Sequence, residues 1–286
     1  MKSWKYYLLV MPALLLSVSV VLIPGLLTAY VSFTDWNGVS PEVKWIGLKN
    51  FADIFADKVF WQALSDNIRW LLMFLTIPVF IGLLTATLLL RRKKGRTTYQ
   101  MIFLFPYVLA PVTNAILWLN IILNPVSGVI GYFRHIGLSI PAPLGSIDTA
   151  LYGVALVDIW HYWGFLTVVY LAALRQTPVE QVEAATVEGV NGWQLFRYVY
   201  FPSIRPTFQL MFVLITIFSF LTFDYIYLMT GGGPAHATEM LSTYAYTFAF
   251  AAFQFGKASA VGLMMSLFGL IASFCYTWLS RKEIMA

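Results

Sequence analysis

The side chains that most often carry out catalysis or bind metals are few in this chain and lie far apart. The histidines are His135, His161 and His236, and the single cysteine, Cys275, has no partner for an internal disulfide. Catalysis needs a nucleophile beside a base or a pair of acids, and a metal site needs several closely spaced ligands. The sequence offers no such set, so we predict neither an enzyme nor a metal site.

Two acidic residues interrupt apolar stretches that are otherwise uncharged, Asp158 within 149–174 and Asp224 within 207–230. A charge at the centre of a bilayer costs about 2.5–3.5 kcal/mol, so each carboxylate needs a polar partner or a watery cavity. One interpretation is a structural ion pair between Asp224 and Arg69. The other is a polar path, lined by hydrogen-bonding groups and ring faces, to which we assign Asp224, Tyr225, Tyr227, Trp160 and His161.

A polar segment, residues 175–206, separates two apolar stretches and begins with signals for a short helix. Residues 177–180 read Thr-Pro-Val-Glu, a predicted capping box with Pro178 at the first helical position. Gly189 is placed to end that helix. Glu183 lies within it, followed by the small residues Ala184 and Ala185, which permit close approach by a partner.

A second short helix is predicted in the same segment. Asn191 offers a cap, with Gln194 three residues later, and we expect Pro202 and Pro206 to stop this helix and start the next apolar span. Three aromatic residues would share one of its faces, Trp193, Phe196 and Tyr200.

The charge of the first helix distinguishes between two surfaces on which this hairpin could rest. A helix lying on anionic lipid normally carries Lys and Arg on its polar face. This one carries Glu180, Glu183 and Glu188 and no basic residue. We therefore expect a protein partner rather than the bilayer.

Composition places the chain in a membrane. Hydrophobic residues make up 59% of its 286 residues and charged residues only 11%, against about 25% charged in soluble domains. A helix needs roughly 20 apolar residues to cross the hydrocarbon. We predict an all-α polytopic protein with six transmembrane helices, near 7–33, 68–90, 99–123, 150–174, 207–230 and 258–280.

The basic residues predict the orientation. With the N-terminus inside, the cytoplasmic segments hold most of the Lys and Arg, including residues 91–96, RRKKGR. The positive-inside rule then places both termini and the 175–206 loop in the cytoplasm. RRKKGR is most simply a topology determinant acting on anionic lipid, so the net charge of +5 calls for no nucleic acid.

An outward-facing turn is predicted at residues 231–234, Gly-Gly-Gly-Pro, which must turn or unwind the chain. No Gly-Lys-Ser/Thr follows, so this cluster is not a phosphate-binding loop. No other segment carries a nucleotide motif. If ATP drives this protein, the nucleotide binds to a separate chain.

The sequence resembles permease subunits of ABC importers. Its 175–206 segment is similar to the loop by which those permeases dock on their ATPases, which reads Glu-Ala-Ala, a glycine four residues later, and a hydrophobic-Pro ending. Residues 223–234 resemble the end of the family's fifth span, and Trp36, Asn67 and the 47–51 run, Gly-Leu-Lys-Asn-Phe, also correspond. The ordered set covers nearly the whole chain and is most similar to the maltose and glycerol-3-phosphate branch.

The resemblance implies a type-I importer permease fold in a bacterial or archaeal plasma membrane. It also implies the partners, namely a second related permease, two cytoplasmic ATPases that bind ATP and Mg, and an external solute-binding protein. The residues that would couple to an ATPase are Glu183, Ala184, Ala185, Gly189, Phe196, Phe201 and Pro202. Solute, expected to be a sugar or oligosaccharide, would pass between the two permeases.

Two departures from the family are visible. Phe201 stands where leucine is usual before Pro202, a conservative change in an apolar contact, and no large periplasmic domain lies between spans. Along the chain we expect a first helix with an external loop over 1–63, a permease core over 64–280 and a cytoplasmic tail over 281–286. The alternative function is an ion-coupled secondary transporter, for which Asp158, His161 and Asp224 are the only candidate coupling groups.

Overall fold

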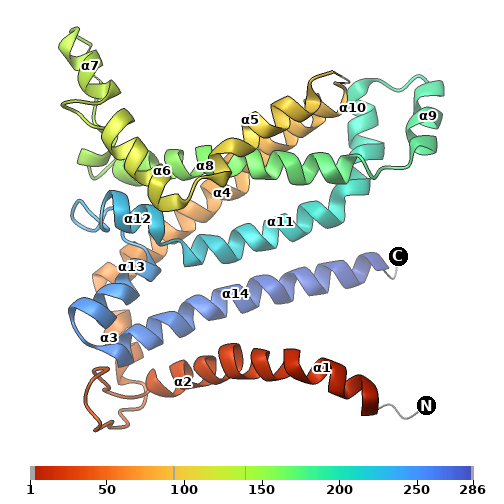
Figure 1. Ribbon diagram of the computed structural model, residues 1–286. Helices are drawn as coiled ribbons and strands as arrows, with labels where there is room; N and C mark the ends of the chain where they lie inside the picture. The colour runs from red at the N-terminus through yellow and green to blue at the C-terminus, as the bar shows by residue number, and fades with distance from the viewer. Residues whose placement is uncertain (1–3, 93, 139, 285–286) are drawn as a thin grey trace. The chain divides into compact units, whose positions relative to one another are not determined.

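The computed structural model describes residues 4–92, 94–138 and 140–284 (Figure 1). These residues form helices joined by loops, and an isolated bridge links Thr34 to Trp45. The helical prediction is therefore confirmed over the described part of the chain. Lys2 and the last two residues of the predicted 281–286 tail lie outside the described residues, while residues 281–284 continue the last helix.

The contacts divide the chain into two compact units, each built from non-consecutive segments. The first comprises Met1–Trp61 and Leu241–Leu267, and the second comprises Gln62–Met240 and Phe268–Ala286. The first unit contains α1 (Trp4–Ser17), η1 (Val18–Leu22), α2 (Ile23–Val31), α3 (Lys49–Ala56), α13 (Leu241–Tyr246), η5 (Thr247–Ala251) and the start of α14 (Phe255–Ile284).

Polar contacts hold the loops of the first unit together. The amide of Asn50 donates hydrogen bonds to the carbonyl oxygens of Ser32 and Thr34, at 2.9 and 2.8 Å. Lys257, at the start of α14, lies 3.3 Å from Asp53 on α3. In contrast, Leu9–Val31, which lies within the first predicted span near 7–33, has no apolar part buried by the rest of the chain.

The second unit contains the remaining elements. They are α4 (Lys58–Leu90, from Gln62), α5 (Arg96–Val108), α6 (Pro111–Leu117), η2 (Trp118–Ile122), α7 (Val129–His135), η3 (Pro143–Gly145), α8 (Ala150–Leu174), α9 (Val179–Val187), α10 (Gly192–Leu195), η4 (Phe196–Tyr200), α11 (Phe201–Leu221), α12 (Asp224–Met229) and the end of α14.

Helix α8 is the centre of the second unit, and 56% of its most apolar stretch is buried inside the protein. Helix α5 crosses it so closely that a Cβ at Gly164 would overlap the carbonyl oxygen of Phe103. The hydroxyl groups of Thr85 on α4 and Thr167 on α8 share a hydrogen bond of 2.7 Å. Small residues and hydroxyl pairs of this kind commonly join helices in membranes, where apolar surface alone gives no preference for a neighbouring helix over lipid.

Five helical stretches are long and apolar enough to cross a membrane, and the count rises to six if a bent pair forms one span. That pair, Arg96–Val108 and Pro111–Ile122, is bent by 91°. The sequence predicted one continuous helix near 99–123, and the structure breaks it at Leu109 and Ala110. The reason is local, because the residue before a proline is disfavoured in helical conformation and Ala110 is extended, with ψ 138°.

The fifth predicted span also differs from expectation. Helix α10 continues through η4 into α11, so the helical stretch begins at Gly192 rather than near residue 207. We had predicted that Pro202 and Pro206 would stop the second short helix, but both lie inside the continuous stretch and do not interrupt it. At the other end the helix breaks at Thr222 and Phe223 before α12 begins.

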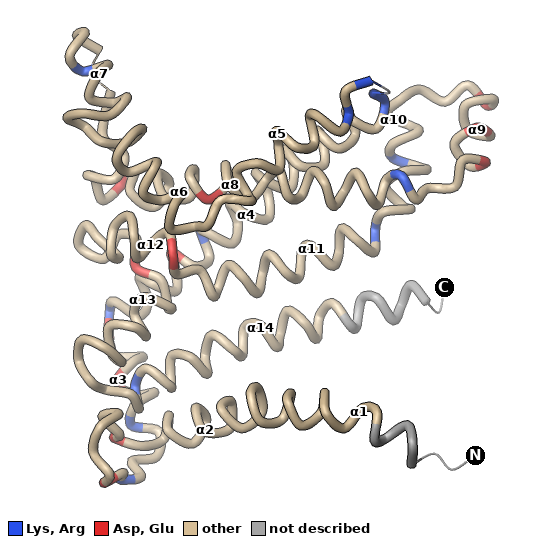
Figure 2. Tube along the Cα trace, viewed as in Figure 1, with Lys and Arg blue, Asp and Glu red and all other residues tan. Residues whose placement is uncertain are grey.

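Charges avoid the middle of the helices. Figure 2 shows Lys, Arg, Asp and Glu mainly at helix ends and in loops, with few along the helical shafts of the second unit. Because carboxylates within spans are costly, the exceptions, Asp158 on α8 and Asp224 at the α11–α12 break, mark the place to look for a site.

Candidate functional site

The first helix of the 175–206 loop is α9, and it begins differently from the prediction. Thr177 does not cap it, because its hydroxyl is buried and has no hydrogen-bond partner among the described residues. Pro178 takes the cap position instead. The predicted end is correct, since Gly189 has φ +76° and the amides of Gly189 and Val190 donate to the carbonyls of Thr186 and Ala185. This is a Schellman motif, which needs a left-handed residue after the helix.

The second helix begins as predicted and then changes its winding. Asn191 and Gln194 form a reciprocal capping box. Residues Phe196–Tyr200 form the π-helical turn η4, in which the amide of Phe201 donates to the carbonyl of Phe196. The extra residue in the turn moves Phe201, rather than the predicted Tyr200, beside Phe196, with ring centroids 6.0 Å apart.

A row of aromatic rings follows from this winding and connects the loop to the core of the unit. It begins at Trp193, whose side chain is 70% exposed, and ends at Tyr170 on α8, which is fully buried. The row runs through Trp193, Phe196, Phe201, Phe208 and Tyr170, and its successive ring centroids lie 5.9, 6.0, 5.6 and 6.1 Å apart. The loop is therefore packed continuously onto the membrane helices.

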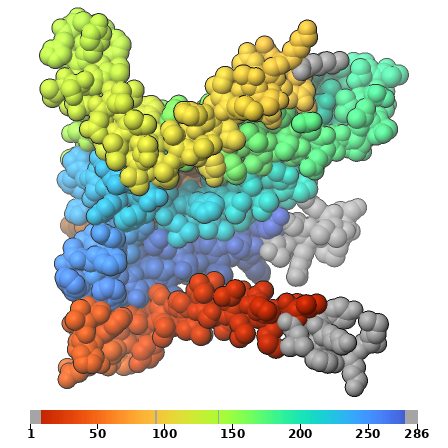
Figure 3. Space-filling view, in the orientation of Figure 1, coloured from red at the N-terminus to blue at the C-terminus, as the bar shows by residue number. Residues whose placement is uncertain are grey.

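The acidic helix α9 is open to a partner. Glu183 is exposed and forms no hydrogen bond or ion pair with any residue that the structure describes. Ala184 beside it is also exposed, and Ala185 is half-buried. In the space-filling view the loop, green to teal, lies at the surface next to the connection between α4 and α5 (Figure 3). A surface helix with a carboxylate unpaired within the described residues, and with small neighbouring side chains, is suited to contact with another protein.

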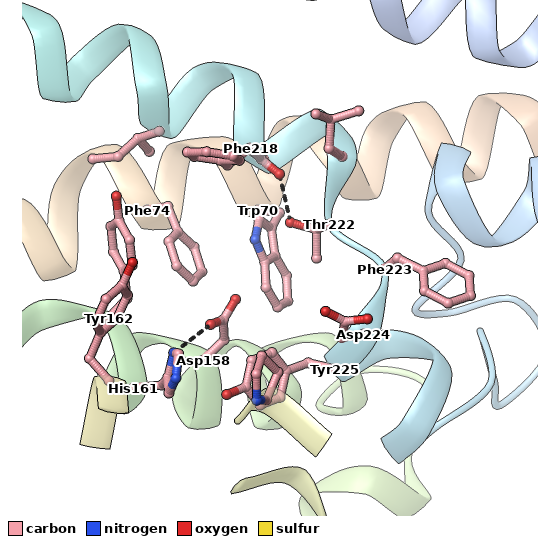
Figure 4. A pocket seen from close by; sticks show the side chains of 15 residues that line it. Trp70, Phe74, Asp158, His161, Tyr162, Phe218, Thr222, Phe223, Asp224 and Tyr225 are labelled. Atoms are coloured by element: carbon pink, nitrogen blue, oxygen red, sulfur yellow. Dashed lines mark hydrogen bonds and ion pairs between the residues drawn. The ribbon is translucent and has the colours of Figure 1, made fainter. Parts of the chain in front are cut away.

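A cavity of about 440 Å³ lies within the second unit, bounded by the two helix breaks (Figure 4). Most of its lining side chains are aromatic or aliphatic, two are acidic, and none is Lys or Arg. The lining consists of Trp70, Phe74, Tyr107, Pro111, Asp158, His161, Tyr162, Ile215, Phe218, Ser219, Leu221, Thr222, Phe223, Asp224 and Tyr225.

The carboxylates of Asp158 and Asp224 both point into this space, with the indole of Trp70 across from them (Figure 4). His161 lies one turn after Asp158, and its Nδ1 is 3.9 Å from the Asp158 carboxylate. Its Nε2–H donates to the carbonyl of Leu109, at 3.1 Å, which is a backbone group released by the α5–α6 break. The Leu109 carbonyl thus orients the imidazole, and the imidazole supplies the hydrogen bond that this carbonyl lacks at the helix break.

The half-helices that follow the two breaks are joined by a hydrogen bond next to the cavity. Asn114 on α6 donates through its side-chain amide to the hydroxyl of Tyr225 on α12, at 2.9 Å, and both residues are buried. The ring of Tyr225 lies 5.8 Å from that of His161. Both breaks are therefore fixed in place by side chains from other elements.

The structure brings together three of the five residues predicted for a polar path. Asp224, Tyr225 and His161 line the cavity. Trp160 instead packs edge-on against Trp118, with centroids 5.5 Å apart. Tyr227 is 44% exposed and does not line the cavity; its ring stacks on the lining residue Phe223, with centroids 4.9 Å apart.

The proposed ion pair between Asp224 and Arg69 is not formed. Arg69 lies 3.0 Å from Asp66, three residues before it on α4. Asp66 also accepts a hydrogen bond of 3.0 Å from Gln62. Two local partners on the same helix face therefore hold Asp66, and Asp224 faces the cavity instead.

The predicted path included His161 but not its neighbours Asp158 and Tyr162. The three residues lie at i, i+3 and i+4 on α8, a spacing that places them on one helix face and could have indicated the group. Trp160, at i+2, points elsewhere by the same rule. Trp70 and Phe74 on α4 carry no such signal, because two aromatic residues four apart in an apolar stretch are typical of a helix core. In the structure their rings stack, with centroids 5.1 Å apart.

Two broken spans of an all-helical membrane protein border an aromatic cavity that holds two carboxylates, which is the organisation of a transport component. Comparison with known proteins identifies the kind. Residues 78–284 match the family described as the binding-protein-dependent transport system inner membrane component. The chain belongs to this family, as the resemblance in the sequence predicted.

Curated relatives match over nearly their full length. The probable starch degradation products transport system permease protein AmyD of Thermoanaerobacterium thermosulfurigenes is 32% identical over 278 residues, covering 97% of this chain and 94% of the relative. The trehalose/maltose transport system permease protein MalF of Thermococcus litoralis is 27% identical, covering 96% and 92%. The chain is accordingly a permease component and not an enzyme.

Solved structures establish the fold. A bacterial ABC transporter involved in the import of the acidic polysaccharide alginate contains a chain that superposes with a TM-score of 0.84 at 24% identity. The match covers 98% of this chain and 96% of that one. A bacterial alginate ABC transporter in complex with alginate pentasaccharide-bound periplasmic protein gives a TM-score of 0.85 at 22% identity, over 98% of this chain and 95% of that one. The predicted importer permease fold is confirmed.

Proposed function

We propose that this chain is the permease subunit of an ATP-driven importer for a saccharide. It would form half of the translocation path beside a second, homologous permease, with two cytoplasmic ATPase subunits that bind ATP and Mg and an external solute-binding protein. Its relatives named for starch products and trehalose/maltose support a saccharide as the solute.

The observation that carries this proposal is the cavity. Saccharides present hydroxyl groups, which donate to carboxylates, and apolar ring faces, which stack on aromatic side chains. Asp158 and Asp224 supply the acceptors, and Trp70, Tyr107 and Tyr162 are among the rings. With no Lys or Arg in the lining, the cavity favours a neutral or amino saccharide and disfavours an acidic one.

The loop supports the coupling step. Glu183 is free to accept hydrogen bonds from an ATPase subunit, and α10 continues through η4 into α11 without interruption. A displacement of the loop would therefore move the helix that ends at the Thr222–Phe223 break beside the cavity. Nucleotide bound to the ATPase and solute bound in the cavity would then both shift the equilibrium between two positions of this helix.

The proposed orientation places both termini, RRKKGR and the Glu183 loop in the cytoplasm. In a Cys275→Ser background, a cysteine introduced at Asp53, which is exposed on α3, should react with an impermeant thiol reagent from outside intact cells. A cysteine at Gly95, in the connection before α5, should react only after the membrane is opened. Labelling of the Gly95 position from outside would reverse the topology.

The transport activity is testable with the complete complex. The permease is purified with its ATPases and second permease, reconstituted into vesicles, and supplied with the solute-binding protein encoded beside it. We expect ATP-dependent uptake of a neutral or amino saccharide and little uptake of a uronate oligosaccharide of the same length. Uptake driven by an ion gradient without ATP would instead establish the secondary transporter.

A further inference from the structure

A second hollow of the same unit, about 330 Å³ in volume, lies between the end of α4 and the start of α10. Its floor on α4 is apolar, with Phe80, Leu84 and Leu88 spaced four residues apart on one helix face. These side chains are 68%, 47% and 60% exposed. The strip they form is roughly 12 Å long, and it faces away from the protein core.

One end of this groove is basic. Arg91 is the first residue after α4, and its guanidinium lies against Gly192, where a Cβ would contact its Nη2 atom. The neighbouring arginines are used within the chain, since Arg96 donates to the carbonyl of Leu90 at 3.1 Å and Arg92 lies 4.5 Å from the ring of Tyr99. Arg91 has no hydrogen bond or ion pair with any residue in the described ranges.

The remaining wall is Trp193, which is 70% exposed despite its size. Tryptophan is favoured where apolar chains meet polar headgroups, and Arg91 ends the apolar run of α4 at the same level. No acidic residue lines the groove. An occupant must therefore combine an anionic head with an apolar tail.

We propose that this groove binds an anionic phospholipid, with its phosphate on Arg91, an acyl chain along Phe80, Leu84 and Leu88, and Trp193 at the boundary between them. Basic pockets between helices on the cytoplasmic side of a membrane hold acidic headgroups in this way. The bound lipid connects the end of α4 to the helix that continues into α11. This binding is independent of which solute is transported.

The test uses the assembled complex in vesicles of phosphatidylcholine containing a small fraction of brominated lipid, which quenches nearby indoles. The contribution of Trp193 is isolated as the difference from a Trp193→Phe variant. We expect brominated phosphatidylglycerol to quench Trp193 more strongly than brominated phosphatidylcholine at the same mole fraction. Arg91→Gln should reduce this preference about fivefold, the effect expected for one basic group near the membrane surface.

Lys94→Gln is the matched control, because it removes a charge from the same exposed connection without touching the groove. It should leave the preference for phosphatidylglycerol intact. Equal quenching by the two brominated lipids would contradict the proposed headgroup site. Absence of quenching by either lipid would mean that another chain of the complex covers the groove, and would equally overturn the proposal.

Discussion

Replacing Glu183 with alanine should lower ATP-dependent uptake by the complex about tenfold or more, while the permease still inserts into the membrane. The exposed carboxylate forms no bond to the described residues, so its removal costs α9 little. Its loss would leave a donor on the ATPase unpaired, and a hydrogen bond to a charged group is worth about 1.5–3 kcal/mol. ATPase retention on the purified complex and solute-stimulated ATP hydrolysis are measured together with uptake.

Glu180→Ala is the matched control, since it removes another carboxylate from the first turn of the same helix. It should retain most of the uptake. Gly189→Val should be at least as harmful as Glu183→Ala, because a β-branched residue does not readily adopt φ +76°. No atom lies within 4 Å of a Cβ placed there, so the effect would come from the backbone alone. Wild-type retention, hydrolysis and uptake in both Glu183→Ala and Gly189→Val would show that this loop does not transmit the ATPase movement.

The second large effect is expected at the cavity, where Asp224→Asn should reduce uptake about tenfold without disturbing assembly. The amide keeps the shape of the side chain but loses the charge that strengthens a hydrogen bond from a saccharide hydroxyl. Initial rates of uptake over a range of solute concentrations give the size of the loss, and co-purification of the subunits shows whether assembly is intact.

Tyr227→Phe is the comparison for this variant. The sequence alone placed Tyr227 on the path with Asp224, but Tyr227 is not among the lining residues and its ring stacks on Phe223, which is. We expect Tyr227→Phe to transport within about twofold of wild type, since the substitution keeps the ring and changes a residue outside the cavity lining. An equal loss in Tyr227→Phe would place Tyr227 on the path with Asp224, and full activity in Asp224→Asn would remove that carboxylate from it.

The features predicted correctly from sequence are those decided by neighbours along the chain. The end of α9 at Gly189 and the capping box of Asn191 and Gln194 depend on groups within a few residues of each other. The apolar stretches likewise follow from composition, because the bilayer requires a minimum apolar length whatever the packing. Family membership was also visible, since the Glu183 motif and the 223–234 run are linear patterns.

The incorrect predictions at the helix ends have causes outside the local sequence. Thr177 has the residues of a capping box around it, yet burial at the end of α8 keeps its hydroxyl from α9. The π-helical turn η4 carries the helix past Pro202, and it places Phe201 rather than Tyr200 in the row of rings that reaches Tyr170. The spacing of apolar residues in the sequence assumes 3.6 residues per turn, so it does not predict the additional residue that the π-helical turn contains.

The sequence by itself determined the class of protein, the apolar spans, the acidic loop and the presence of two costly carboxylates. Only the tertiary structure decided that Asp158 and Asp224 share one cavity and that Trp160 and Tyr227 lie outside it. The helix breaks at Thr222 without a proline or glycine there that would have predicted the break. The cavity depends on which faces of α4, α8 and α11 meet, and on bonds such as that from His161 to Leu109, which join residues far apart in the chain.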